Sequence, residues 1–338
     1  MGSVLDYQLM IGDETTYGTP VTVTRGYEHN PGDGMDYRPN RYQGEALRPG
    51  QVGDRRARRA TPNFDYGGTF NTQPLSKGFG YLINKLMGGT PSNTVVSGSV
   101  YQVNHTLGGA LKPFTLQQGI PRIGADGSST IDPFTYAGCV VPSWGLSMDN
   151  AGVLQLKFDV DARELSTATA LATYSGPPTT ANLFTFAGAS IYGGTYTAPT
   201  TTALATGGTA LANVTNWNLD VSRNANVSRF TFGNGGKKNI PVPGKAAVTG
   251  TIGIEYTDQV YRDAYLNDTD LTLVLNFEAA TLATGKETIQ IDIANFRLDG
   301  ELPKPNAEVT TASCNFTALE NDTNPLLQII QRSLDTTL

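Results

Sequence analysis

The chain has 338 residues, a formal net charge of −6, only 16% charged residues and 38 glycines. This length allows two ordinary domains or one large all-β domain, and such a composition is typical of many short strands joined by tight turns. An acidic chain lacks the basic field that a surface gripping nucleic acid needs. We therefore predict a mainly β protein that does not bind DNA tightly.

Residues that could hold a metal or a cofactor are sparse. Cys139 and Cys314 lie in apolar strand patterns, which favours buried free thiols over a disulfide. His29 and His105 are the only histidines and are far apart in the sequence, so no His-based metal site is expected within one subunit. The N-terminus lacks a signal-peptide pattern, and no run is long enough to span a membrane. We expect a soluble, intracellularly made protein without a cofactor.

Residues 1–60 are predicted to form an extended arm. Thr16–Thr24 reads as one short strand, whereas Gly26–Arg59 has almost no apolar periodicity, and loops of that length usually bind something. The arm ends in an arginine cluster: Arg55, Arg56, Arg58 and Arg59. This cluster is either a solvated charge run or a contact between subunits, because an acidic protein offers a complementary surface. Nucleic-acid binding is a third interpretation.

A strand and the clearest helix follow the arm. In Phe64–Phe70 the aromatic residues share one face, while Asp65 and Thr69 share the other. An apolar stripe at helical spacing predicts a helix over Leu75–Met87, closed by Gly88 and packed on a sheet. Short strands are expected around residues 95–103 and 114–116.

The most regular pattern of the chain is a hairpin over Tyr136–Glu164, with its turn at Asp149–Gly152. From Leu154 to Asp161 apolar and polar residues alternate strictly. This period of two directs Leu154 and Phe158 into a core, and it directs the intervening polar residues toward solvent or a partner.

The second part of the chain repeats this order of elements. Strands are predicted over residues 214–221, 227–232, 248–256, 271–277, 288–294 and 309–317, with a helix over Thr257–Leu266 and a lysine-bearing loop over Gly233–Ala246. Gly68–Phe70 aligns with Gly250–Ile252, and helix aligns with helix. We predict two tandem β-sandwich domains, each with one flanking helix and a long loop. Their bounds are 1–165 for the arm and the first domain, 166–182 for a linker, and 183–338 for the second domain.

The search for catalytic chemistry finds little. Nucleophile elbows, phosphate-binding loops and zinc-spaced cysteines are absent. Asp159 and Asp161 have the spacing of paired carboxylates, but Lys157 shares their face, so a polar strand surface is the simpler interpretation. Asn267–Asp270 lacks the glycine and distal glutamate of a calcium loop. No enzymatic activity and no metal site are predicted.

The order of strand, long loop, strand, helix and paired strands resembles the tail tube (major tail) proteins of long-tailed bacteriophages. Glu14–Pro20, which precedes the arm, and Tyr136–Val140, which leads into the Leu154–Val160 strand, carry this resemblance, which covers most of residues 14–330. It implies a virion protein, assembled in the host cytoplasm, whose subunits close into rings with one continuous inner β-barrel. The rings stack into a tube that passes genomic DNA. Implied partners are other copies of the chain and the tape measure, tail-tip and terminator proteins.

On this resemblance, the polar strand faces are expected to line the lumen. The candidates are Asp65, Thr69, Gln155, Asp159, Asp161, Thr251, Glu255, Asn315 and Thr317. The basic loops are expected to join subunits or rings. Their candidates are Arg55, Arg56, Arg58, Arg59, Lys237, Lys238 and Lys245. Because a tube needs about six such domains, we expect three two-domain chains per ring, with a hexamer as the alternative.

A different class of function is a carbohydrate-binding or adhesin-type β-sandwich. Such a module would display clustered exposed aromatic residues, whereas Trp144 and Trp217 lie within apolar strand runs.

Overall fold

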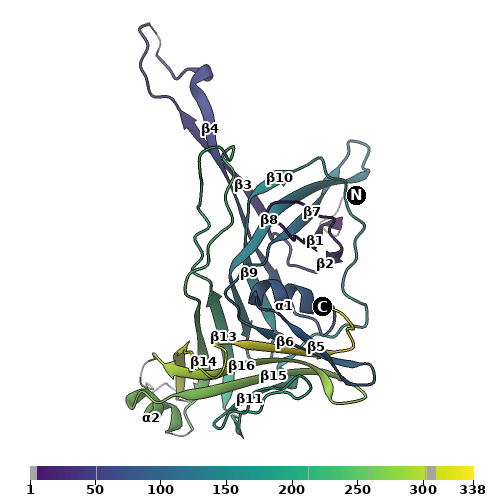
Figure 1. Cartoon of the computed structure of the whole chain (residues 1–338), viewed down its shortest axis with the longest axis vertical. Helices are drawn as coiled ribbons and strands as arrows, with labels where there is room; N and C mark the ends of the chain where they lie inside the picture. Colours follow the sequence, from purple (N-terminus) through teal and green to yellow (C-terminus); the bar gives the residue numbers. More distant parts are fainter. Residues whose placement is uncertain (1–5, 51, 212, 258, 301, 303–309) are drawn as a thin grey trace.

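The computed structural model describes residues 6–50, 52–211, 213–257, 259–300, 302 and 310–338. This part of the chain is mainly β, with two short α-helices, α1 (Gly80–Met87) and α2 (Val260–Leu266) (Figure 1). None of its helices is long and apolar enough to cross a membrane. The prediction of a mainly β fold with one flanking helix in each half of the chain is confirmed.

One antiparallel sheet, here called the long sheet, runs through both halves of the chain. The C-terminal part of β8 lies at its centre and pairs with strands from both halves. Since β4 is the strand partner of β3 and the outer edge of β3 has none in the described part of the chain, the sheet is open. The strands of the long sheet, in order of pairing, are β3 (Gly34–Gln43), β4 (Arg59–Thr72), β9 (Gln155–Ala162), β8 (Ser129–Met148), β13 (Val214–Ser222), β14 (Ala247–Glu255) and β17 (Thr311–Ala318).

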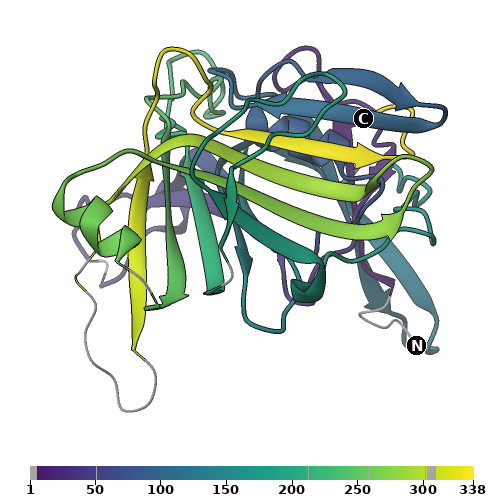
Figure 2. The same cartoon turned by 90° about the horizontal axis from the view of Figure 1, so that it is seen from below.

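Two outer sheets pack against the long sheet and enclose the core. Figure 2 shows the larger one as a curved layer around β15, β16 and β18. The smaller outer sheet is formed by β2 (Arg25–Gly26), β1 (Gln8–Asp13), β7 (Phe114–Ile123), the N-terminal part of β8, and β10 (Glu164–Ser166). The larger one is formed by β12 (Thr209–Ala210), β11 (Ala189–Gly193), β15 (Leu271–Thr281), β16 (Lys286–Leu298), β18 (Gln328–Ser333), β6 (Val100–Thr106) and β5 (Ser92–Ser97).

The strand pairing of the first half recurs in the second. The pairs β1–β2, β1–β7, β7–β8, β3–β4, β4–β9 and β8–β9 have the counterparts β11–β12, β11–β15, β15–β16, β13–β14, β14–β17 and β16–β17. Each helix follows the second strand of its hairpin, α1 after β4 and α2 after β14. Strands β5 and β6, between α1 and β7, have no counterpart between α2 and β15. The first half therefore carries an insertion.

A single hydrophobic cluster contains residues from both halves, so the halves share one core. The alternating strands supply Phe70, Phe158, Ile252 and Phe316, all at most 3% exposed. Helix α1 is buried in this core beside β6 and β8, and the indole N–H of Trp144 donates to the carbonyl of Leu86 at 3.2 Å. Burying so much apolar surface is the main force that holds the layers together.

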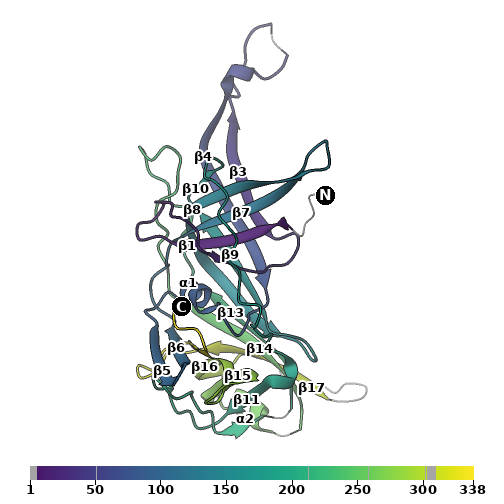
Figure 3. The ribbon, with the colours of Figure 1, turned by 90° about the vertical axis from the view of Figure 1, so that its right-hand side faces the viewer.

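The predicted loop over Gly26–Arg59 is wrong, because most of it forms a hairpin. Strand β3 pairs with β4 from Gly34 to Gln43, and the hairpin projects from the body with the 3₁₀ turn η2 (Arg56–Arg58) near its tip (Figures 1 and 3). Most residues of β3 are partly or fully exposed. An apolar face is therefore not needed there, and the strand forms through its backbone ladder with β4 instead.

Two other predicted strands are also wrong. Thr16–Thr24 contains no strand, because Gly18 adopts a φ of 75° and the chain turns between β1 and β2. Residues 227–232 belong to the loop between β13 and β14.

Helix α1 begins at Gly80 rather than Leu75, because Leu75 makes a bridge to Leu183 and Gly78 has a φ of 78°. Strands β1, β11 and β18 and the turn η3 (Phe186–Gly188) were not predicted.

Candidate assembly surfaces

The long sheet has one apolar face against the core and one open polar face. Rows of directly opposed side chains cross the polar face from strand to strand. In one row Thr69 on β4 and Ser143 on β8 both donate to the carboxylate of Asp159 on β9, at 2.6 and 2.7 Å. Because hydroxyls satisfy both oxygens of this acid, the row is fixed without a basic residue.

A second row crosses the junction between the halves. It runs through Gln155, Ser147, Asn218, Thr251 and Asn315, each directly opposite the next on the neighbouring strand. At its end the Thr251 hydroxyl donates to the Asn315 side chain at 2.9 Å. The polar face is therefore continuous over five strands that belong to both halves.

All the predicted lumen residues lie on strands of this sheet and on its polar face. Most are exposed or half-buried, and Glu255 and Asn315 are exposed. Asp161 differs, because it is 7% exposed and its carboxylate contacts the Lys238 ammonium. Burial raises the pKa of Asp161 to about 6, and the bond to Lys238 acts in the opposite direction.

The loop of residues 223–246 covers one end of the polar face. It leaves β13 in the second half and lies against strands of the first half, where the Phe64 amide donates to the carbonyl of Gly236 at 3.2 Å (Figure 1). Lys238 is 1% exposed and contacts both Asp65 and Asp161, and Lys237 contacts Glu164. These two lysines, predicted to join subunits, are thus engaged within their own subunit, whereas Lys245 is exposed.

The arginine cluster lies at the projecting end of the β3–β4 hairpin (Figure 3). Arg56, Arg58 and Arg59 are exposed, and Arg55 is half-buried. Among the described residues none of these arginines forms an ion pair with an acid of the same subunit. The hairpin therefore presents uncompensated positive charge away from the body of an acidic protein.

The described residues contain no group of three or more His, Cys, Asp or Glu side chains that could hold a metal ion. The Asn267–Asp270 segment is a turn in which Asp268 and Asp270 bind Arg297 at 2.8 and 2.6 Å. Cys139 and Cys314 are both free and buried, as predicted. Trp144 and Trp217 are 3% and 5% exposed, so neither can contribute to an aromatic carbohydrate-binding surface.

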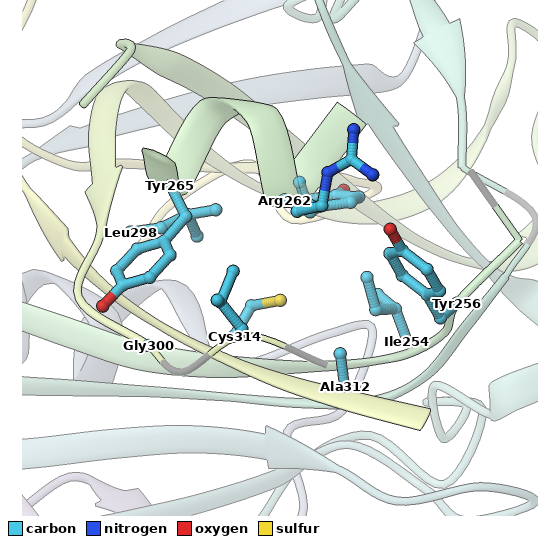
Figure 4. Close-up of a pocket in the computed structure, with 10 residues that line it drawn as sticks. Ile254, Tyr256, Arg262, Tyr265, Leu298, Gly300, Ala312 and Cys314 are labelled. Atoms are coloured by element: carbon cyan, nitrogen blue, oxygen red, sulfur yellow. The ribbon is translucent and has the colours of Figure 1, made fainter. Parts of the chain in front are cut away.

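Two features of these surfaces escaped sequence analysis. One is the open edge of β3, although Met35 and Tyr37 alternate there with Asp36 and Arg38 in a period of two. The other is a pocket between α2 and the long sheet, which arises from long-range pairing and leaves no local signal in the sequence (Figure 4).

The structure is mainly β and has an open sheet edge, a continuous polar face and a projecting hairpin. These features are typical of proteins whose subunits assemble through their sheets. The family model described as Phage tail tube protein matches residues 6–318. The chain belongs to this family, and is therefore a structural component of the phage virion tail that assembles with other tail components. A search of curated proteins found no match.

Proposed function

We propose that the chain polymerises as stacked rings and that the stack is the conduit for genomic DNA during ejection into the host. The observation that carries this proposal is the polar face that continues from the first half into the second. A sheet that is open in the monomer and polar on one face becomes a closed wall when subunits join edge to edge. Closure also removes the exposed strand edge, which otherwise invites aggregation.

The proposed wall of the lumen consists of the predicted polar residues of β4, β9, β14 and β17. Their acids with exposed surface are Asp65, Asp159 and Glu255, whereas Asp161 is buried against Lys238; the others are uncharged, and Lys157 also lies on this face. Such a surface repels the phosphate backbone weakly and offers few lasting basic contacts, so DNA slides through without binding. The passage of DNA is thus transient and non-specific.

We further propose that each chain supplies two equivalent units, residues 1–165 and 183–338, joined by the linker 166–182. The recurring strand pairs of the two halves support this division. Three chains would then form a pseudo-sixfold ring. The arginine cluster and Lys245 would contact neighbouring subunits or rings. Tape measure, tail-tip and terminator proteins would complete a tail that assembles in the host cytoplasm.

Electron microscopy of the purified protein tests the proposal. Tubes are expected to form, and their cross-section is expected to show the face with Thr69, Asp159 and Asn315 toward the lumen. Monodisperse globular particles at every salt and protein concentration would contradict polymerisation. Tubes with this face on the outer wall would contradict only the assignment of the lumen.

A further inference from the structure

The junction between the two halves resembles an interface between subunits, although it lies inside one chain. The C-terminal part of β8 pairs with β13, so that Trp144 lies opposite Val221 and Ser143 opposite Ser222. Trp144 and Val221 are 3% and 2% exposed. The Trp144 ring also contacts α1 through its bond to the Leu86 carbonyl. The junction therefore seals the core of the first half.

One row of large core-side residues crosses the first half, where Phe70, Phe158 and Trp144 lie opposite one another on β4, β9 and β8. The corresponding row in the second half is made of much smaller residues. In the second half Ile252 lies opposite Cys314. The chain after β16 continues along β17, because the Asp299 amide donates to the Asn315 carbonyl at 2.8 Å.

Because Asp299 continues the pairing with β17, the next residue, Gly300, lies beside Cys314, as Trp144 lies opposite Phe158 in the first half. Gly300 is therefore the counterpart of Trp144. A Cβ atom added to Gly300 would lie 3.4 Å from the Cα of Cys314. A glycine and a cysteine thus stand where the first half has a tryptophan and a phenylalanine, and the second half lacks most of the volume of the row.

The missing volume leaves an apolar pocket between α2 and the sheet, shown in Figure 4. Its lining includes Ile254, Tyr261, Tyr265, Leu298, Gly300 and Cys314. Helix α2 also exposes Val260 and Leu266, at 58% and 61%, whereas most of α1 is buried. This end of the molecule thus has an incompletely covered core.

At the opposite end of the long sheet, β3 is the counterpart of β13. Met35 lies opposite Gly68 on β4, as Leu219 lies opposite Gly250 on β14. By this register Tyr37 corresponds to Val221 and Arg38 to Ser222. Tyr37 is 45% exposed, although its ring stacks on Tyr66 at 5.4 Å. The strand therefore carries a core-side aromatic residue at an edge that has no strand partner among the described residues, although the Met35 amide on this edge donates to the Gln118 side chain at 3.1 Å.

We propose that β3 of a second copy of this chain docks beside Asp299 and Gly300 at the α2 pocket, in the register that the pairs Ser143–Ser222 and Trp144–Val221 have at the internal junction. Tyr37 of that copy lies beside Gly300, and its ring occupies space that Trp144 fills in the first half. Arg38 lies opposite Asp299, where the internal junction has two serines. Both side chains are exposed in the single subunit, and their charges are complementary. The inference rests on the proposed ring and identifies the contact that closes it.

A cysteine pair tests the register. In the double variant Arg38→Cys and Asp299→Cys, mild oxidation of assembled protein is expected to give disulfide-linked multimers on a non-reducing gel. Opposed positions on antiparallel strands have the Cα separation that a disulfide needs. Each single variant, and Arg38→Cys combined with Thr281→Cys on the outer sheet, are the controls and remain monomeric on the gel. Equal cross-linking in the Thr281 control would overturn the register.

A matched pair of tyrosine substitutions tests the pocket. Tyr37→Ser is expected to raise the protein concentration needed for assembly by about tenfold or more, since buried aromatic anchors dominate interfaces. Tyr42→Ser removes an exposed ring of the same strand, 55% exposed, and leaves that concentration unchanged. Equal effects of the two substitutions would refute the docking of Tyr37.

Microscopy of the same samples separates this inference from the proposed function. Wild-type tubes together with no cross-link in the Arg38–Asp299 pair would overturn the contact and leave the tube in place. Wild-type protein that forms neither tubes nor rings would overturn both.

Discussion

At the scale of single residues, Lys238 is the clearest case of a charge whose role depends on the tertiary structure. It lies in a loop of the second half, yet its ammonium contacts two carboxylates of the first half, Asp65 and Asp161. The lysine side chain is 2% exposed, whereas that of Asp65 is 42% exposed. An uncompensated charge in such a place is costly, so the contact pins the loop to β4 and β9.

We predict that Lys238→Met lowers the free energy of unfolding by about 3 kcal/mol, because it leaves the buried Asp161 without its cation. This loss lies at the lower end of the range for breaking a buried ion pair, because the second carboxylate that Lys238 contacts, that of Asp65, is still reached by solvent. Lys237→Met is the matched control and costs about 0–1 kcal/mol, because the Lys237–Glu164 pair is partly exposed. Denaturant unfolding of the two variants measures both values, and equal losses would contradict the prediction.

His105 is a second residue whose state depends on burial. It is 1% exposed on β6, and neither ring nitrogen has a hydrogen-bond partner among the described residues. Burial, aided by the charge of Lys112, lowers the pKa of His105 to about 3. The ring is therefore neutral in the folded protein at pH values well above 3.

Protonation of His105 is predicted to destabilise the fold in acid. Its folded pKa lies below the unfolded value of about 6.5, so the unfolded chain binds the proton first as the pH falls. Above pH 6.5 the imidazole is neutral in both states, and its burial has no effect on the pH dependence of stability. Between pH 6.5 and pH 3 only the unfolded chain is protonated, so the free energy of unfolding falls by about 1.4 kcal/mol per pH unit. His105→Leu removes this pH dependence. Its stability, measured by denaturant unfolding between pH 8 and pH 4, is expected to fall less than that of the wild type; parallel profiles would count against the assignment.

At the scale of elements, the β3–β4 hairpin combines a strand edge with a charged tip. Surface ion pairs contribute about 0–1 kcal/mol each, so only several arginines acting together produce a measurable contact. Replacing Arg55, Arg56, Arg58 and Arg59 with Ser is predicted to leave the unfolding transition unchanged and to shorten or abolish tubes. Because salt screens exposed charges beyond about 10 Å at 0.1 M, wild-type tubes are expected to lose length at high salt as well.

The control for the arginine cluster carries Ser at Arg122 and Lys286, which pair with acids of their own subunit. Tube length by negative-stain microscopy and stability by thermal unfolding are compared for both variants. Normal tubes from the variant lacking the cluster would remove it from the contacts between rings.

At the scale of the whole molecule, the number of chains per ring depends on whether both halves build the wall. The two halves share their strand pairing, and one continuous sheet joins them. The mass of an isolated ring is therefore predicted to be about three times the 36.0 kDa of one chain. Native mass spectrometry of dissociated tubes measures it. A mass of about six chains would mean that only one half of each subunit forms the wall.

The sequence alone determined those features that a local pattern encodes. The alternation from Leu154 to Asp161 predicted the strand β9 and its two faces, because side chains on a strand alternate with a period of two. The same reasoning assigned the polar residues of β4, β14 and β17 to one face. The repeated order of elements indicated two halves and a family resemblance that the family match now supports.

Only the tertiary structure decided features that depend on pairing between distant segments. Strand β3 has only a short apolar alternation, at Met35 and Tyr37, because little of it is buried, and it forms because β4 supplies backbone partners. Lys238 and Asp161 lie 77 residues apart, so neither neighbourhood in the sequence indicates that they neutralise each other. The pocket at Gly300 exists because this glycine lies beside Cys314 on a neighbouring strand. Register between strands is set by the packing of the whole core, and no local window of sequence contains that information.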